Sequence, residues 1–154
     1  MSVFLLCYRN ASHTVNFPTL KKYKDLTVKK NIIFYFSLIG EKDSDKLYEE
    51  NKNFLKLNEF ENLYPEILSN GQKKKMNLFR TLVPSYELYL IDEPENGLDD
   101  ESKKELDNKL KLLSEESTII YTSHNQNSLS VYEKTNKAVS YTHLRAHETD
   151  SYLV

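Results

Sequence analysis

The stretch that decides the fold class runs from residue 88 to residue 94 and reads LYLIDEP. Four apolar residues followed by two carboxylates are typical of a buried central strand whose carboxyl end reaches the edge of a parallel sheet. Because α/β proteins bind ligands at that edge, Asp92 and Glu93 are candidates for holding Mg²⁺ and for activating a water molecule. An ordinary strand followed by an acidic turn is the alternative interpretation.

Strand and helix patterns alternate around this stretch. We predict a helix that begins after Gln72, a strand over residues 86–92, a helix near residues 100–113 and a strand over residues 117–122. A strand, a helix and a strand in this order predict a right-handed crossover in a parallel sheet. The sequence therefore predicts an α/β fold.

The region before residue 68 has a different pattern. Apolar residues recur at helical spacing, and a charged, glycine-containing segment over residues 40–45 interrupts them. We predict a small helical subdomain over residues 27–67. Residues 1–26 are interpreted as a remnant of a core or a loop that precedes it.

Residues 68–72 read LSNGQ and directly precede one of the predicted helices. Ser69 is a good N-cap, and Asn70 and Gly71 both tolerate a positive φ. The backbone N–H groups, the helix dipole and the Ser69 hydroxyl can all point at a phosphate there. A simple helix N-cap without a ligand also explains this motif.

Two further polar residues follow predicted strands. His124 comes after the strand over residues 117–122, and a histidine at such a strand end can bind a phosphate oxygen and an attacking water. A surface histidine is the alternative. Asp99 lies in the loop that follows Asp92, where capping of the next helix is the alternative to a role at a ligand.

Composition narrows the classes of function. The chain has 154 residues, with 21 Lys and Arg against 23 Asp and Glu, so we expect no nucleic-acid partner. The basic run over residues 73–75 is interpreted as a solvated helix face. Cys7 is the only cysteine, which excludes an intramolecular disulfide. The longest uncharged apolar stretch, residues 32–40, is far shorter than the roughly 18 residues that cross a bilayer, so we expect any membrane association to come from a partner.

Taken together, the motifs resemble the ATP-binding cassette (ABC) ATPases. In that family a signature motif, a Walker B strand, a D-loop and a switch histidine occur in the order and at the separations of Ser69, Asp92, Asp99 and His124. The resemblance covers roughly residues 26–125. It implies a partial P-loop NTPase, an ABC cassette with a parallel sheet and a small helical subdomain.

The resemblance also implies roles for single residues. Residues 68–137 would form the half of the ATPase core from the signature to the switch histidine. Glu93 would be the catalytic base, His124 the sensor of the γ-phosphate, and Asp92 a ligand of Mg²⁺ through water. In a head-to-tail dimer that encloses two ATP molecules, a second protomer would contact ATP through Ser69, Asn70, Gly71, Gln72 and Asp99.

The function that this family membership favours is that of the ATP-binding and ATP-hydrolysing subunit of an ABC transporter. Such a subunit lies at the cytoplasmic side of a membrane, or at the matrix side in an organelle, and its partners are transmembrane permease subunits. Residues 4–6 ahead of residues 26–28, followed by residues 31–35 and the compact helical region, also faintly resemble the haem exporter ATPases of cytochrome c maturation. A non-transport ABC ATPase of the translation-factor type is a further alternative.

Two features depart from the family pattern. No G-x-x-x-x-G-K-[ST] phosphate loop is present, since the only glycines are Gly40, Gly71 and Gly97. We therefore interpret the chain as a C-terminal fragment and expect it to be inactive alone. Residues 138–154 resemble the translation of a sequencing adapter, and we predict a non-native tail there.

Overall fold

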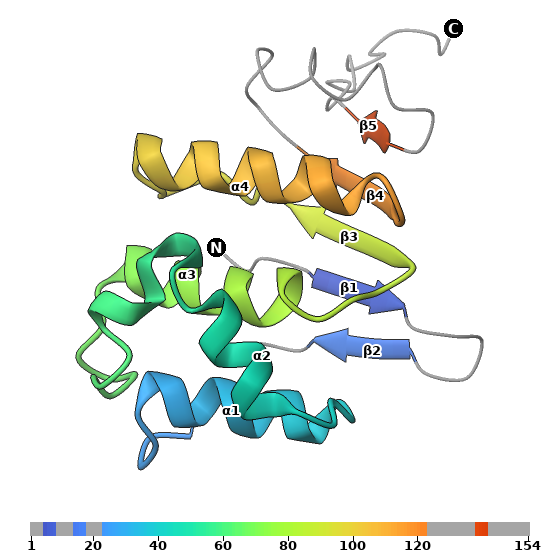
Figure 1. The fold of residues 1–154 in the computed structure, drawn as a ribbon. Helices are drawn as coiled ribbons and strands as arrows, with labels where there is room; N and C mark the ends of the chain where they lie inside the picture. Colours follow the sequence, from blue (N-terminus) through green and yellow to red (C-terminus); the bar gives the residue numbers. More distant parts are fainter. Residues whose placement is uncertain (1–4, 9–13, 18–22, 123–137, 142–154) are drawn as a thin grey trace, which may run out of the picture.

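A five-stranded mixed β-sheet runs through the structure, with its strands in the order β2-β1-β3-β4-β5 (Figure 1). The structure, a computed structural model, describes residues 5–8, 14–17, 23–122 and 138–141. The strands are β1 (Leu5–Tyr8), β2 (Thr14–Phe17), β3 (Leu88–Asp92), β4 (Thr118–Thr122) and β5 (Ala138–Tyr141). The strand that ends at Asp92 is therefore the central one, as the sequence predicts.

The pair of strands at the centre confirms the predicted parallel unit. β3 and β4 are parallel, with Leu88 opposite Thr118 and Asp92 opposite Thr122, and helix α4 (Asp100–Leu113) connects them. The whole sheet is mixed, because β1 is antiparallel to both β2 and β3. The sequence analysis assigned no strand to residues 1–26, since an apolar pattern over only four residues is too short to define an element.

β3 is less buried than the sequence predicts, since four consecutive apolar residues indicate a strand that is covered on both faces. Tyr89 and Ile91 are fully buried, whereas Leu88 and Leu90 are half-buried. Successive side chains of a strand point to opposite faces of the sheet, so one face of β3 is covered and the other is partly open. Within the described residues, β3 thus has the alternating burial of a strand with one covered face.

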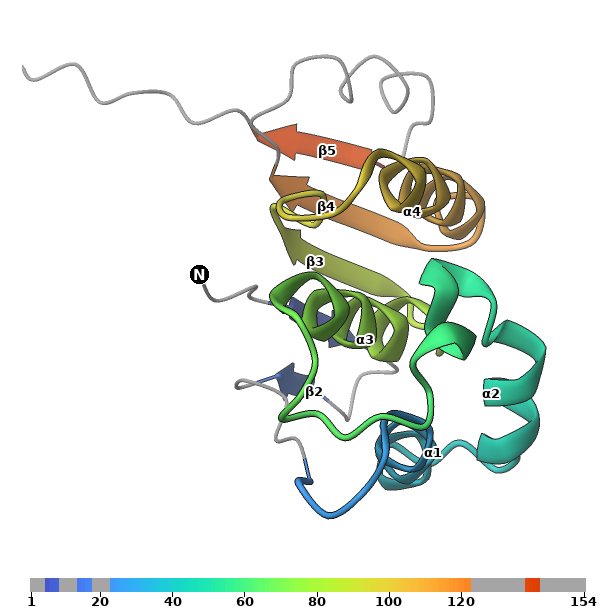
Figure 2. The same cartoon turned by 90° about the vertical axis from the view of Figure 1, so that its left-hand side faces the viewer.

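β5 lies inside the segment 138–154, which we predict to be a non-native tail. Its four residues pair with β4 in parallel, from Ala138 opposite Ile119 to Tyr141 opposite Thr122. This strand extends the sheet beyond β4 (Figure 2). The origin of the segment in the coding DNA stays a prediction.

Two amphipathic helices accompany the sheet. α3 (Asn70–Leu82) buries Met76 and Phe79, and α4 buries Leu106 and Leu110. α4 begins at residue 100 as predicted, whereas α3 begins at Asn70, ahead of the predicted start after Gln72. No helix in the described part of the chain combines the length and the apolar character needed to span a bilayer.

Residues 27–67, which we predict to form a small helical subdomain, contain α1 (Val28–Leu38), α2 (Ser44–Asn51) and the 3₁₀ segment η1 (Phe54–Glu59). The break predicted over residues 40–45 is observed: α1 ends before Gly40, which has a φ of 87°, and α2 begins four residues later. Glycine adopts this left-handed conformation without steric cost, which allows the chain to reverse between the helices.

Aromatic packing joins the helical subdomain to α3. Phe79 of α3 stacks on Phe36 of α1 with ring centroids 6.1 Å apart, and it also packs against Tyr48 of α2 and Phe54 of η1. Phe36, Tyr48 and Phe79 are completely buried. The helical subdomain and α3 therefore share one hydrophobic core.

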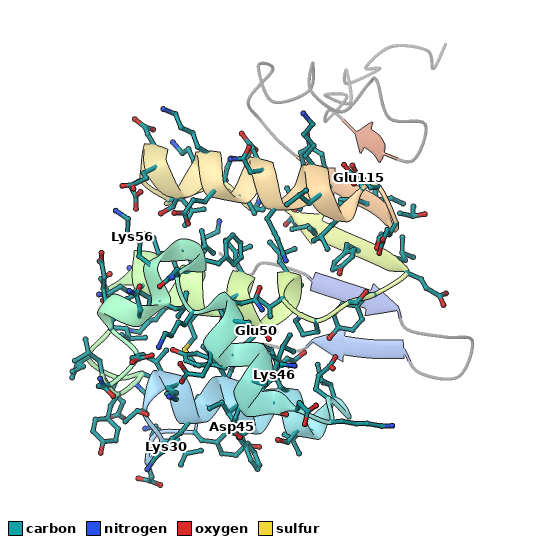
Figure 3. The ribbon with its side chains drawn as sticks, in the orientation of Figure 1. Lys30, Asp45, Lys46, Glu50, Lys56 and Glu115 are labelled. Atoms are coloured by element: carbon teal, nitrogen blue, oxygen red, sulfur yellow. The ribbon has the colours of Figure 1, made fainter. Side chains whose placement is uncertain are left out.

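Polar contacts join η1 to α4. Glu105 accepts a hydrogen bond of 2.7 Å from the backbone N–H of Leu55, and the Lys56 ammonium lies 2.5 Å from a carboxylate oxygen of Glu101. Figure 3 shows Lys56 at the side of η1 that faces α4. Leu55 and Lys56 both have a positive φ, so these contacts support a turn that is unfavourable for residues other than glycine.

Candidate functional site

The signature turn (residues 69–72), the end of β3 and the D-loop (residues 97–99) lie together in the structure. A Cβ atom added to Gly71 would lie 3.5 Å from the backbone oxygen of Gly97. Lys74 and Lys75, in the first turns of α3, reach the β3 end and the D-loop respectively. The structure therefore places three of the four predicted motifs beside one another: the signature turn, the end of β3 and the D-loop.

The signature turn forms a capping box at the start of α3. The Ser69 hydroxyl accepts a hydrogen bond of 3.2 Å from the N–H of Gln72, and the Gln72 side-chain oxygen accepts one of 3.0 Å from the N–H of Ser69. This confirms Ser69 as the N-cap. Asn70 and Gly71 are the first helical residues and do not use the positive φ that both tolerate. A Cβ atom at position 71 would meet the backbone oxygen of Gly97 at an ordinary van der Waals distance, so the D-loop backbone is the neighbour of this position.

Donors at the start of α3 are only partly used. The Gln72 N–H is bonded to the Ser69 hydroxyl, and the Lys73 N–H is bonded to the Ser69 carbonyl at 2.9 Å. Among the described residues, the backbone N–H groups of Asn70 and Gly71 have no bonded acceptor. Unpaired N–H groups at the positive end of a helix dipole are suited to bind an anion.

Thr122, at the end of β4, fixes both carboxylate residues at the end of β3. Its hydroxyl donates a hydrogen bond of 2.5 Å to Asp92 and accepts one of 3.1 Å from the backbone N–H of Glu93. The Thr122 carbonyl oxygen also accepts from the Glu93 N–H, at 3.2 Å. Thr122 is a functional residue that its sequence pattern does not predict. The parallel register of the two strands, which only the fold establishes, places Thr122 opposite Asp92.

Glu93 has a left-handed backbone, with a φ of 43°. For a residue with a Cβ atom this conformation costs about 1–2 kcal/mol, and such strain clusters at functional sites. The side-chain amide of Asn96 donates to the Glu93 carboxylate, and the Lys74 ammonium donates to the Glu93 carbonyl oxygen at 2.8 Å. These contacts hold the strained residue in place.

Asp99 is the N-cap of α4. Capping of this helix is the alternative to a role at a ligand that the sequence left open. One carboxylate oxygen accepts hydrogen bonds of 2.9 Å from both the backbone N–H and the hydroxyl of Ser102. The other oxygen lies 2.7 Å from the Lys75 ammonium. The Lys75 ammonium and the Ser102 donors hold the pKa of Asp99 well below its usual range.

Burial of the two lysines contradicts the solvated helix face that we predicted for residues 73–75. The Lys75 side chain is only 13% exposed, and Lys74 is half-buried. Burial lowers the pKa of Lys74, while the negative charges of Glu95, Glu93 and Asp92 act in the opposite direction. The prediction was wrong for these two lysines because the D-loop and the end of β3 fold onto this face of α3.

The carboxylates at the end of β3 fit a magnesium ion that arrives with a phosphate ligand. Within the described part of the chain, no three His, Cys, Asp or Glu side chains form a group that could hold a metal by itself. Mg²⁺ is usually bound by one or two carboxylates together with water and substrate phosphates. Asp92 offers a carboxylate of this kind, and its role as a ligand of Mg²⁺ stays a prediction. His124 lies outside the described residues, so its role stays a prediction.

Comparisons with known proteins place the chain in a family. Residues 4–130 match the family model described as "AAA domain, putative AbiEii toxin, Type IV TA system". The sulfate/thiosulfate import ATP-binding protein CysA 1 of Shewanella oneidensis is 33% identical over 118 residues, which are 71% of this chain and 31% of that protein. The bacitracin export ATP-binding protein BceA of Halalkalibacterium halodurans is 32% identical over 103 residues, which are 64% of this chain and 41% of that protein. The chain thus spans about a third of the length of the curated relatives it matches.

Solved structures show the same fold. The ATP-binding cassette MJ0796, in a dimeric post-hydrolysis state bound to ADP and Pi, has a TM-score of 0.59 and 24% identity over 73% of this chain and 52% of that chain. An ATP-binding subunit of an ABC transporter has a TM-score of 0.61 and 22% identity over 71% of this chain and 47% of that chain. The chain is therefore a member of the AAA-domain family, with the fold and the motifs of an ABC nucleotide-binding domain.

Proposed function

We propose that this chain supplies part of the site at which an ABC transporter binds and hydrolyses ATP. The observation that carries this proposal is the joint placement of the signature turn, the β3 carboxylates and the D-loop, with Lys74 and Lys75 between them. The printed names of the similar proteins, which are ATP-binding subunits for import and for export, support it.

The residues of α3 would bind phosphate oxygens of ATP. The N–H groups of Asn70 and Gly71 are two adjacent donors at the start of the helix, and both lack an acceptor among the described residues. The Ser69 hydroxyl, which accepts from Gln72, still has its own hydrogen to donate. In a head-to-tail dimer these donors would face the nucleotide held by the partner protomer.

The end of β3 would perform the hydrolysis step. Asp92, fixed by Thr122, would hold Mg²⁺ through water, and the ion would neutralise charge on the β- and γ-phosphates. Glu93 would accept a proton from the attacking water at a carboxylate oxygen. The hydrogen bond from Asn96 orients this carboxylate beforehand. His124 would contact the γ-phosphate.

Partners of the chain would be a second ATPase protomer and transmembrane permease subunits. The dimeric state of the MJ0796 cassette supports the first partner. Large apolar side chains that are exposed on α1 and on the loop before α3 support a protein partner; they are Phe34, Leu38, Leu63, Tyr64 and Ile67. Leu38 and Ile67 are 61% and 67% exposed.

Replacement of the proposed base tests the function. In a full-length form that carries a phosphate loop, Glu93→Gln is expected to keep ATP binding and to lose nearly all turnover, because the amide cannot accept the proton of water. Phosphate release and nucleotide binding are measured on the same samples. Hydrolysis at the unaltered rate would exclude Glu93 as the base.

A non-transport AAA ATPase is a second candidate function. The description of the matching family model, which refers to a toxin of a type IV system, favours it. The genes beside the coding sequence distinguish the two candidates. A neighbouring gene for a membrane protein supports the transporter subunit, whereas a neighbouring gene for a small partner protein, with no membrane-protein gene, supports the second candidate.

A further inference from the structure

We infer that Lys74 and Lys75 are positioning residues, which fix the signature turn, the Glu93 backbone and the D-loop in one relative arrangement. The inference rests on the proposed function, since it concerns residues that would contact nucleotide. Neither lysine would touch ATP; both would act through the groups to which they donate.

Lys74 acts on the backbone of Glu93. Its ammonium donates to the Glu93 carbonyl oxygen at 2.8 Å, from α3 to the residue that follows β3. This carbonyl belongs to the residue with the left-handed φ of 43°, and it also accepts from the Asn96 N–H at 3.3 Å. A charged donor on this oxygen favours one orientation of the peptide group and thereby of the Glu93 side chain.

Lys75 acts on the D-loop. Its ammonium lies 2.7 Å from the Asp99 carboxylate; the Lys75 side chain is 13% exposed and that of Asp99 is 55% exposed, so water reaches the ion pair from the Asp99 side only. Asp99 in turn caps α4 through Ser102. The contact therefore joins the first turns of α3 to the start of α4.

The closeness of the two loops completes this arrangement. Gly71 is a near neighbour of the D-loop, since a Cβ atom added to it would lie 3.5 Å from the backbone oxygen of Gly97. In a head-to-tail dimer, the signature turn of a protomer would serve one nucleotide, and Glu93 of the same protomer would serve the other. The two lysines would then link the two nucleotide sites through a single chain.

Amide hydrogen exchange on the present chain tests this inference without nucleotide. The variants Lys74→Met and Lys75→Met keep the aliphatic stem and remove the donor, and Lys73→Met is the matched control, since no contact joins Lys73 to the D-loop among the described residues. In both test variants we expect the N–H groups of Asn96 and Leu98 to exchange about tenfold faster. In the control, exchange is expected to stay unchanged.

Rescue and double variants separate positioning from a general loss of stability. Lys74→Arg and Lys75→Arg keep a positive donor. In contrast to the methionine variants, they are expected to show the slow amide exchange and the Glu93 Cα chemical shift of the wild type. Asp99→Asn keeps an N-cap but removes the charge, so it should reproduce Lys75→Met, and the double variant should add nothing. Unchanged exchange at Asn96 and Leu98 in Lys74→Met and Lys75→Met, or additive effects in the double variant, would overturn the inference. Because no ATP is involved, this result is independent of the turnover test of Glu93.

Discussion

At the scale of single residues, the side chains around Asp92 and Glu93 act mainly to hold these two groups in place. Thr122 is bonded to both, Asn96 to the Glu93 carboxylate, and Lys74 to the Glu93 carbonyl. The carboxylates themselves could be predicted from the sequence, since an apolar run followed by two acids is a local pattern. The residues that hold them could not, because they come from other elements and only the fold brings them close.

Replacement of Thr122 by valine tests this support. The change removes a hydroxyl that donates to Asp92 and accepts from the Glu93 N–H, so the free energy of unfolding is expected to fall by about 1–2 kcal/mol. Urea unfolding measures the effect. Thr118→Val, at the exposed start of the same strand, is the control and should change stability by less than about 0.5 kcal/mol. An equal effect of both changes would show that the hydroxyl of Thr122 is not important.

Asp99 gives a pH dependence with a definite sign. Its pKa in the folded chain is lowered by Lys75 and Ser102, so its contribution to stability is fully present above the unfolded value of about 3.9 and is lost as the pH falls towards the folded value. Wild type is therefore expected to be more stable than Asp99→Asn at pH 7, with a difference that shrinks below about pH 4. Urea unfolding of both proteins across this range measures it; a constant difference would contradict the ion pair.

At the scale of elements, the helices that carry capping signals could be predicted closely. Ser69 and Asp99 cap α3 and α4 as their positions in the sequence indicate. β1 and β2 could not be predicted, since each has four residues and depends on pairing with strands elsewhere in the chain. The left-handed turn at Leu55 and Lys56 could not be predicted either, because its support comes from Glu101 and Glu105 of α4.

The capping box at the start of α3 can be tested by one change. Ser69→Ala removes the acceptor for the Gln72 N–H and is expected to lower the free energy of unfolding by about 1 kcal/mol. Ser69→Asp keeps an acceptor at this position and should retain most of the stability. Thermal or urea unfolding distinguishes the two variants, and equal stability of Ser69→Ala and wild type would contradict the capping role.

At the scale of the whole molecule, one aromatic residue connects the helical subdomain to the rest. Phe79 packs against Phe36, Tyr48 and Phe54, which come from three different elements. Phe79→Ala should therefore cost about 3–5 kcal/mol and loosen α1 and α2 together. Leu112→Ala, at a position 62% exposed, is the control, with an expected effect below about 0.5 kcal/mol. Retention of the full stability by Phe79→Ala would contradict a shared core.

In the proposed dimer, the signature turn and the β3 carboxylates of one chain belong to different nucleotide sites. Mixing two inactive variants tests this arrangement most directly. In full-length form, Ser69→Arg blocks the signature turn and Glu93→Gln removes the base. In a mixed head-to-tail dimer, one of the two sites regains both intact groups. We predict that the mixture recovers ATP turnover, up to about a quarter of the wild-type rate for random pairing of protomers. A mixture as inactive as each variant alone would contradict this arrangement.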